Sequence, residues 1–186
     1  QRLNMMVKKD YDTIRRMAVE GPYDHNTAGA LYKSRLIEAC PDELDAMCLH
    51  ILNTASDQIG GETAQLIVQY ISASRSGLRP SDLELIFKKQ KKEWNALSFA
   101  QFYQYMRALF IIREDDRYDF SHLSIRDGFR KMSELSSGVL DPSTQNPLTH
   151  LHRAILAHLE SLPGSDPLKM NELVYHCLMA DDKNTL

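Results

Sequence analysis

The periodicity of apolar residues changes twice between residues 98 and 135, and this change constrains the fold more than any other feature. The apolar positions first follow helical spacing and form one continuous stripe: Phe99, Phe102, Tyr103, Met106, Leu109 and Phe110. Directly after this stripe, apolar and polar residues alternate on both sides of Asp115-Asp116, as in a short β-hairpin. Helical spacing resumes at Leu123. The sequence therefore predicts a helix, a two-stranded hairpin and a second helix in direct succession.

Two further helices are predicted immediately upstream of this stripe. Leu66, Ile67, Tyr70 and Ile71 line the first helix. The second begins in PSDLELIF, where Ser81 and Glu84 have the spacing of a capping box, and Ser98 is the expected N-cap of the helix that carries the stripe. Three helices, a hairpin and another helix follow one another in a winged-helix domain. The sequence therefore predicts such a domain over residues 62–135.

Helical segments are predicted on both sides of this domain. On the N-terminal side they cover residues 10–19, 26–39 and 41–59, and the third begins at Pro41 and ends at Gly60-Gly61. On the C-terminal side, the stretch SSGVLDPSTQNP is a linker by composition, and two helices follow in LTHLHRAILAHLESL and LKMNELVYHCLMA.

The expected fold class is therefore mainly α. It comprises a helical segment (residues 1–60), a winged-helix domain with a small β-hairpin wing (62–135) and a C-terminal helical tail (148–186).

Composition limits the classes of function. The chain has 186 residues, of which 43% are hydrophobic and 25% charged, as is normal for a globular protein. No apolar run reaches the roughly 20 residues that span a bilayer, and the N-terminus lacks a secretory signal, so we expect a cytoplasmic protein without membrane contact. Cys40, Cys48 and Cys177 form no CxxC pair and predict reduced core thiols. The ends, Gln1 and KNTL, indicate a piece of a longer polypeptide.

Motifs for catalysis or metal binding are not found in the sequence. There is no phosphate loop of the form GxxxxGK[ST], no GxSxG and no HExxH, so the chain is predicted not to be an enzyme. His150, His152 and His158 are two, six and eight residues apart, which places no two of them on adjacent turns of one helix face. We therefore expect surface or capping histidines and no metal site.

A DNA-binding regulator is one alternative function, because winged helices can insert their third helix into the major groove. The outward face of that helix is expected to carry Gln101, Gln104, Tyr105 and Arg107, with a lysine run at 88–92, Arg113 and Arg117 nearby. The net charge of −3 and these few cations give little affinity for phosphate at physiological salt, which weighs against nucleic acid. A purely structural protein-interaction module is the other alternative.

Three stretches taken together resemble a known family: SRSGLRPSDL (74–83), FSHLSIRD (120–127) and ELVYHCLMA (172–180). Over about residues 36–186, the chain resembles the winged-helix region that follows the nucleotide-binding core in STAND signal-transduction ATPases of the NACHT and apoptotic-ATPase type. The tail is similar to the segment that leads into tetratricopeptide or other repeats in nephrocystin-like and related bacterial members.

The resemblance implies a role for His122. In those ATPases a histidine at the hairpin-to-helix corner contacts the β-phosphate of bound ADP and holds the closed, inactive state. His122 matches this position, although Ser-His-Leu stands where many immune receptors have Met-His-Asp, and Ser124 and Arg126 are weaker matches.

The resemblance also implies a function for the whole chain. ADP or ATP would be the cofactor of the parent protein, with none bound by this region alone. The implied partners are the NTPase core of the same polypeptide and proteins bound through the C-terminal helices or repeats. The chain would then be a non-catalytic regulatory region that couples nucleotide state to partner-sensing repeats.

Overall fold

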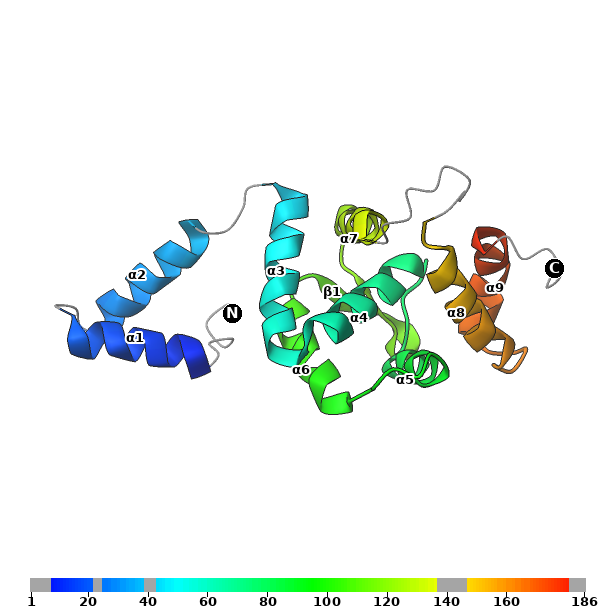
Figure 1. The fold of residues 1–186 in the computed structure, drawn as a ribbon, viewed down its shortest axis with the longest axis horizontal. Helices are drawn as coiled ribbons and strands as arrows, with labels where there is room; N and C mark the ends of the chain where they lie inside the picture. Colours follow the sequence, from blue (N-terminus) through cyan, green and yellow to red (C-terminus); the bar gives the residue numbers. More distant parts are fainter. Residues whose placement is uncertain (1–7, 22–24, 39–42, 137–146, 181–186) are drawn as a thin grey trace. The chain divides into compact units, whose positions relative to one another are not determined.

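The structure is a computed structural model that describes residues 8–21, 25–38, 43–136 and 147–180 (Figure 1). Within the described residues the chain forms two compact units, one within residues 1–50 and one within 51–186. The mainly helical fold with one small antiparallel sheet that the sequence predicts is confirmed. Among the helices described, none combines the length and apolar character that a bilayer-spanning segment needs.

The first unit contains helices α1 (Lys8–Glu20) and α2 (His25–Glu38), which pack against each other. Ile14 of α1 and Ala28 of α2 are buried. Helix α3 (Leu44–Ile59) follows and ends directly before the glycine pair, as predicted. Cys48 of α3 is buried and forms no disulfide with the other described cysteine, whereas Cys40 and Pro41 lie outside the described residues.

The second unit contains the predicted order of three helices, a hairpin and a fourth helix (Figure 1). The elements are α4 (Gly61–Ala73), α5 (Pro80–Lys89), α6 (Ala96–Met106), β1 (Phe110–Ile112), β2 (Tyr118–Phe120) and α7 (Leu123–Ser136), with a short 3-10 turn, η2 (Glu114–Asp116), between the strands. The strands pair antiparallel with Phe110 opposite Phe120. Asp115 and Asp116 have positive φ, so the chain turns where the sequence predicts. These elements follow one another in the order predicted for residues 62–135, and we call the hairpin the wing.

The core residues around the wing are mostly aromatic. The ring of Phe120 stacks on Phe110 at 4.8 Å and on Phe129 of α7 at 5.1 Å between centroids. The apolar stripe of α6 buries Phe99, Phe102 and Met106 against the same core. These contacts attach both strands and α7 to the helices, because the hairpin alone is too short to be stable in water.

Two predicted helix caps are wrong. Helix α5 begins at Pro80, and the backbone amide of Arg79 donates to the Asp82 carboxylate at 3.0 Å, so Ser81 and Glu84 form no capping box. Helix α6 begins at Ala96, and the side chain of Asn95 accepts from the amides of the second and third helical residues at 2.9 and 3.1 Å. Both helices start earlier than predicted. Asn95, a residue suited to capping, directly precedes α6, whereas at α5 the carboxylate of Asp82 inside the first turn accepts from the Arg79 amide.

The C-terminal helices are α8 (Thr149–Glu160) and α9 (Pro167–Met179), as predicted. They lie side by side in Figure 1, and α8 also packs on α4 and α5. Leu156, Cys177 and Ala180 form a small buried cluster between the two helices. Cys177 is buried, as expected, and forms no disulfide with the other described cysteine. Most of the predicted linker between α7 and α8 lies outside the described residues.

Candidate functional site

The segment 74–82, which we call the junction segment, connects α4 to α5 and contacts the wing. Leu78 pairs with Tyr118 of β2 through two backbone hydrogen bonds of 3.2 and 2.9 Å. Gly77 has φ +82°, and a Cβ on it would lie 2.5 Å from the Tyr118 carbonyl oxygen. Only glycine fits this close approach without strain. The junction segment therefore adds one residue, Leu78, that is hydrogen-bonded to the edge of the hairpin.

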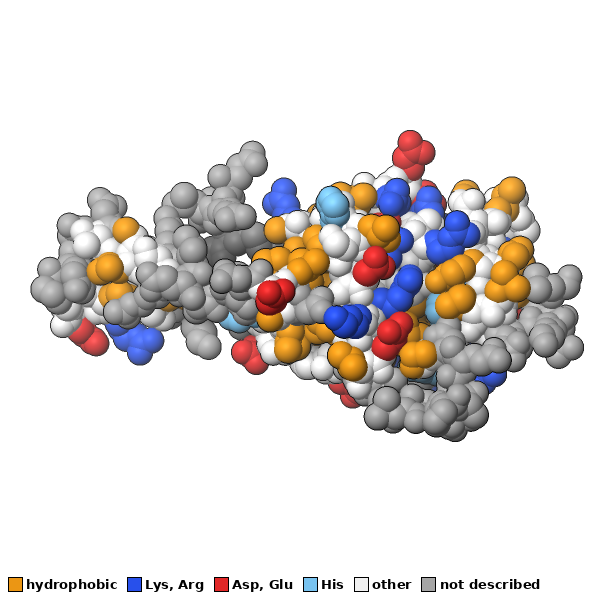
Figure 2. Space-filling model, turned by 90° about the horizontal axis from the view of Figure 1, so that it is seen from above, with side chains coloured by type: hydrophobic (Ala, Val, Ile, Leu, Met, Phe, Trp, Pro, Cys, Tyr) orange, Lys and Arg blue, Asp and Glu red, His pale blue; other side chains and the backbone are white. Residues whose placement is uncertain are grey.

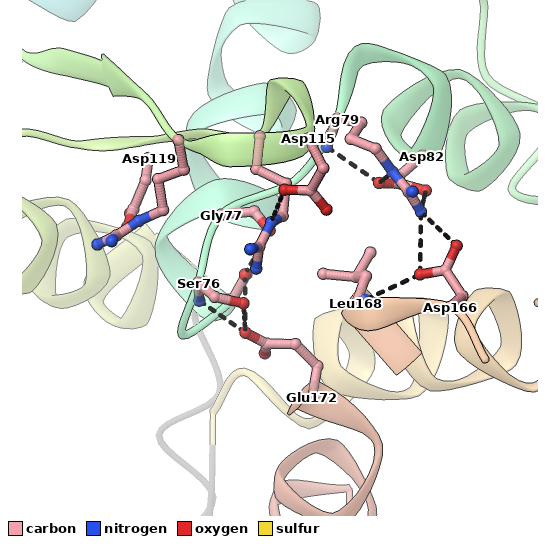
Figure 3. Close-up of polar contacts among 12 residues, drawn as sticks. Ser76, Gly77, Arg79, Asp82, Asp115, Asp119, Asp166, Leu168 and Glu172 are labelled. Atoms are coloured by element: carbon pink, nitrogen blue, oxygen red, sulfur yellow. Dashed lines mark hydrogen bonds and ion pairs between the residues drawn. The ribbon is translucent and has the colours of Figure 1, made fainter. Parts of the chain in front are cut away.

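The same segment binds the last helix through Glu172, which is fully buried on α9. Its carboxylate accepts from the backbone amides of Arg75 and Ser76 at 3.0 and 2.6 Å and from the Ser76 hydroxyl (Figure 3). Burial alone raises the pKa of Glu172, but the hydrogen bonds from His176, Ser76 and the Arg75 amide outweigh burial and lower the pKa to about 2. A buried carboxylate is retained here because donors from two elements surround it.

Two buried histidines continue this network between α8 and α9. His176 Nε2 lies 3.1 Å from the second Glu172 oxygen, and His176 Nδ1 lies 2.9 Å from Nδ1 of His152 on α8. Burial, with the nearby charge of His176, lowers the pKa of His152 to about 3, so its ring is neutral at physiological pH. One Nδ1 donates and the other accepts, which places a single proton between the two rings.

A second buried cluster connects α5 with α8 and α9. The Asp82 carboxylate is paired with Arg79 at 2.8 Å, and Arg79 also reaches Asp166 at the start of α9 at 3.1 Å (Figure 3). Asp82 is also paired with Nε2 of His158 on α8 at 2.8 Å. Burial raises the pKa of Asp82, but the hydrogen bonds from His158 and Arg79 more than offset this and hold the pKa below its ordinary value. Nδ1 of His158 is buried and, within the described residues, has no hydrogen-bond partner. Nε2 is therefore the nitrogen that donates to Asp82, because an ionised carboxylate only accepts hydrogen bonds.

The histidine prediction is thus partly wrong. His150 is exposed, but His152 and His158 are fully buried and belong to these clusters. Within the part of the chain that the structure describes, no group of three or more His, Cys, Asp or Glu side chains has the arrangement of a metal site.

His122 lies at the corner where β2 leads into α7, and its side chain is exposed. Its carbonyl oxygen accepts from the amides of Ile125 and Arg126, so it occupies the start of the helix. Its Nδ1 lies 3.3 Å from the Ser124 hydroxyl, and within the described residues no contact with Nε2 is found. The ring is therefore accessible from solvent.

The corner that carries His122 is held by buried groups. The amide of Ser121 donates to the Leu109 carbonyl at 2.8 Å. Arg126, one turn into α7, pairs with the fully buried carboxylate of Asp119 and donates to the Arg75 carbonyl at 2.8 Å. Asp119 also accepts from Arg113 of the wing at 2.6 Å. The exposed imidazole therefore stands on a fixed backbone.

Four of the cations expected to contact DNA phosphates have partners within the chain. Arg113 and Arg117 pair with Asp119 and Asp115, and Lys92 pairs with Glu62. Lys89 donates to the carbonyl of Ala157 and the hydroxyl of Ser161 at the end of α8. On the face seen in Figure 2, basic side chains are interspersed with acidic and apolar ones. Of the residues expected on the outward face of α6, Gln101 and Gln104 are exposed, as is Arg107 directly after the helix, whereas Tyr105 is half-buried.

The sequence prediction did not find the two buried clusters, although a signal for one is present. On α9, the residues at four-residue spacing Leu168, Glu172, His176 and Ala180 are all buried. Two polar residues inside an otherwise apolar stripe indicate a buried polar contact with another element.

Compared with models of protein families, with curated proteins and with solved structures, the chain matches none of them.

Proposed function

We propose that this chain is the non-catalytic regulatory region of a STAND-type signal-transduction ATPase. In this proposal it couples the nucleotide state of an adjoining NTPase core to partner proteins bound through the C-terminal helices or repeats. The observation that carries the proposal is the exposed imidazole of His122, which stands at the start of α7 on a corner fixed by buried groups.

The chemistry of this corner suits a phosphate group. An imidazole donates a hydrogen bond to phosphate in its neutral and its protonated form. The positive end of the α7 dipole and its first free amides also favour an anion at this place. His122, Ser124 and the start of α7 would therefore contact the β-phosphate of ADP held in the core, which supplies the remaining binding groups.

A contact of this kind regulates only if it exists in one state of the ATPase. A ligand shifts a two-state equilibrium through its difference in affinity for the two states, and couplings between sites are typically about 1–3 kcal/mol, or about 5–150-fold. If His122 touches ADP in the closed state alone, it slows ADP release and holds that state.

The test measures ADP release from a polypeptide that contains the nucleotide core together with this region. We expect His122→Ala to accelerate release of labelled ADP by roughly 5–150-fold. The matched control is His150→Ala, because His150 is an exposed histidine on α8. Equal release rates for the two variants and the unchanged protein would contradict the proposal. The isolated 186-residue chain is expected to hydrolyse no ATP.

The two alternatives make different predictions. A DNA-binding regulator requires free cations, and titration with random duplex DNA at low salt tests it; tight binding that weakens steeply with salt would favour this alternative. A purely structural module expects the His122 ring to be enclosed and bonded to its own chain. The exposure of the ring favours the nucleotide proposal over that alternative.

A further inference from the structure

One peptide group of the junction segment binds α9 on one side and α7 on the other. The amide of Ser76 donates to Glu172 at 2.6 Å, and the carbonyl of Arg75 accepts from Arg126 at 2.8 Å. These two groups belong to the same peptide bond, which is planar and stiff. A displacement of either side chain therefore acts on the other through a single rigid plane.

Each end of this connection is anchored by buried charge. On α9, Glu172 is fully buried and is also bonded to the Arg75 amide and to His176. On α7, Arg126 is simultaneously paired with Asp119, which is fully buried. Removing one partner of such a pair leaves an uncompensated buried charge, which is strongly unfavourable. Each end is therefore expected to keep its bonds when the peptide group between them is displaced.

The connection ends close to the candidate phosphate contact. Arg126 is four residues after His122, and its amide donates to the His122 carbonyl at 3.2 Å. Glu172 is near the middle of α9, which packs against α8 to form the α8–α9 helix pair. The path from α9 to the corner therefore contains one carboxylate, one peptide group and one guanidinium.

We propose that the peptide group between Arg75 and Ser76 couples the α8–α9 helix pair to the corner that carries His122. A partner that pulls on or rotates the helix pair would thereby change the position of His122. The coupling itself belongs to this chain, and only its consequence for ADP rests on the proposed function.

The test measures amide hydrogen exchange in the full 186-residue chain with Glu172→Gln, which keeps the shape of the side chain and removes its charge. We expect faster exchange of the Arg75 and Ser76 amides and, through the coupling, of the Ile125 and Arg126 amides of α7. The expected acceleration at α7 is roughly fivefold or more, which is the lower end of measured site-to-site couplings. Glu84→Gln is the control, because Glu84 is exposed on α5.

A reciprocal substitution tests the connection from its other end. Arg126→Lys keeps the charge, but one ammonium cannot reproduce the forked contacts to Arg75 and Asp119. We expect it to accelerate exchange of the α9 amides around Glu172, and Arg107→Lys on the exposed end of α6 serves as its control. If Glu172→Gln prevents folding, Ser76→Ala replaces it, because it removes one donor to the carboxylate and no buried charge.

The results separate the two proposals. Faster exchange at Arg75 and Ser76 with unchanged exchange at Ile125 and Arg126 would overturn the coupling, as would an Arg126→Lys effect confined to α7. Unchanged ADP release in His122→Ala would instead overturn the nucleotide contact and leave the coupling in place.

Discussion

Replacing Gly77 by alanine tests whether the junction segment requires its close approach to the wing. The residue has φ +82°, and a Cβ would lie 2.5 Å from the Tyr118 carbonyl oxygen and 2.9 Å from Cβ of Asp119. A left-handed conformation costs an alanine about 1–2 kcal/mol. Relief of the clash moves the segment away from β2 and weakens the two hydrogen bonds between Leu78 and Tyr118, each of which contributes about 1 kcal/mol. The free energy of unfolding should fall by roughly 2–4 kcal/mol.

Urea denaturation followed by tryptophan fluorescence measures this change. Trp94 is the only tryptophan, and its ring packs against Phe87 of α5 and Phe99 of α6, so its emission reports on the core that these helices form. The control is Gly164→Ala, because a Cβ at Gly164 meets nothing within 4 Å. The control should change the unfolding free energy by less than about 0.5 kcal/mol. If Gly77→Ala is no more destabilising than Gly164→Ala, the argument from close approach is wrong.

Two further predictions concern protonation and helix capping. The folded-state pKa of His152 is lowered from 6.5 to about 3. The stability that the neutral ring contributes is therefore complete above pH 6.5 and is lost progressively as the pH falls toward 3. In this range the free energy of unfolding should fall by at most about 1.4 kcal/mol per pH unit. Urea midpoints at pH 7.5, 6 and 5 should show this decline, and His152→Gln should flatten it; an equal decline in both proteins would contradict the assignment. Asn95→Ala should lower the free energy of unfolding by about 1 kcal/mol, because it removes the observed cap of α6. Ser98→Ala should change thermal stability little, and the reverse order would refute the observed cap.

The order of elements was predictable because each depends on local periodicity. The stripe of α6 and the alternation around Asp115-Asp116 arise from neighbouring residues, and the structure places the helix and the hairpin where these patterns lie. The caps were less predictable, because several residues near each helix start are able to cap it. At α5 the capping carboxylate is that of Asp82, which also binds His158 of α8, a residue 76 positions away in the sequence. A local pattern contains no information about that partner.

The buried clusters were not predicted for the same reason. Glu172 binds the junction segment across 97 residues of sequence. A glutamate in a helix is usually solvent-exposed, so its residue type alone predicts a surface position. The exposure of His122 could not be predicted from the neighbouring residues alone, because it depends on how the wing and α7 pack around Phe120.

The polar character of the junction has a consequence for how the helix pair is held. Well-packed apolar residues often give as much stability as buried charged pairs, so stability alone does not explain why Glu172 and Asp82 lie there. Charged pairs do exclude other arrangements: moving α9 by one turn, about 5.4 Å, would bury the Glu172 carboxylate without its donors. A shift of α9 is therefore opposed by the loss of the hydrogen bonds to Glu172. Under the proposed coupling, this resistance would carry a movement of α9 to Arg126 and the corner of His122, because a soft contact would absorb the movement.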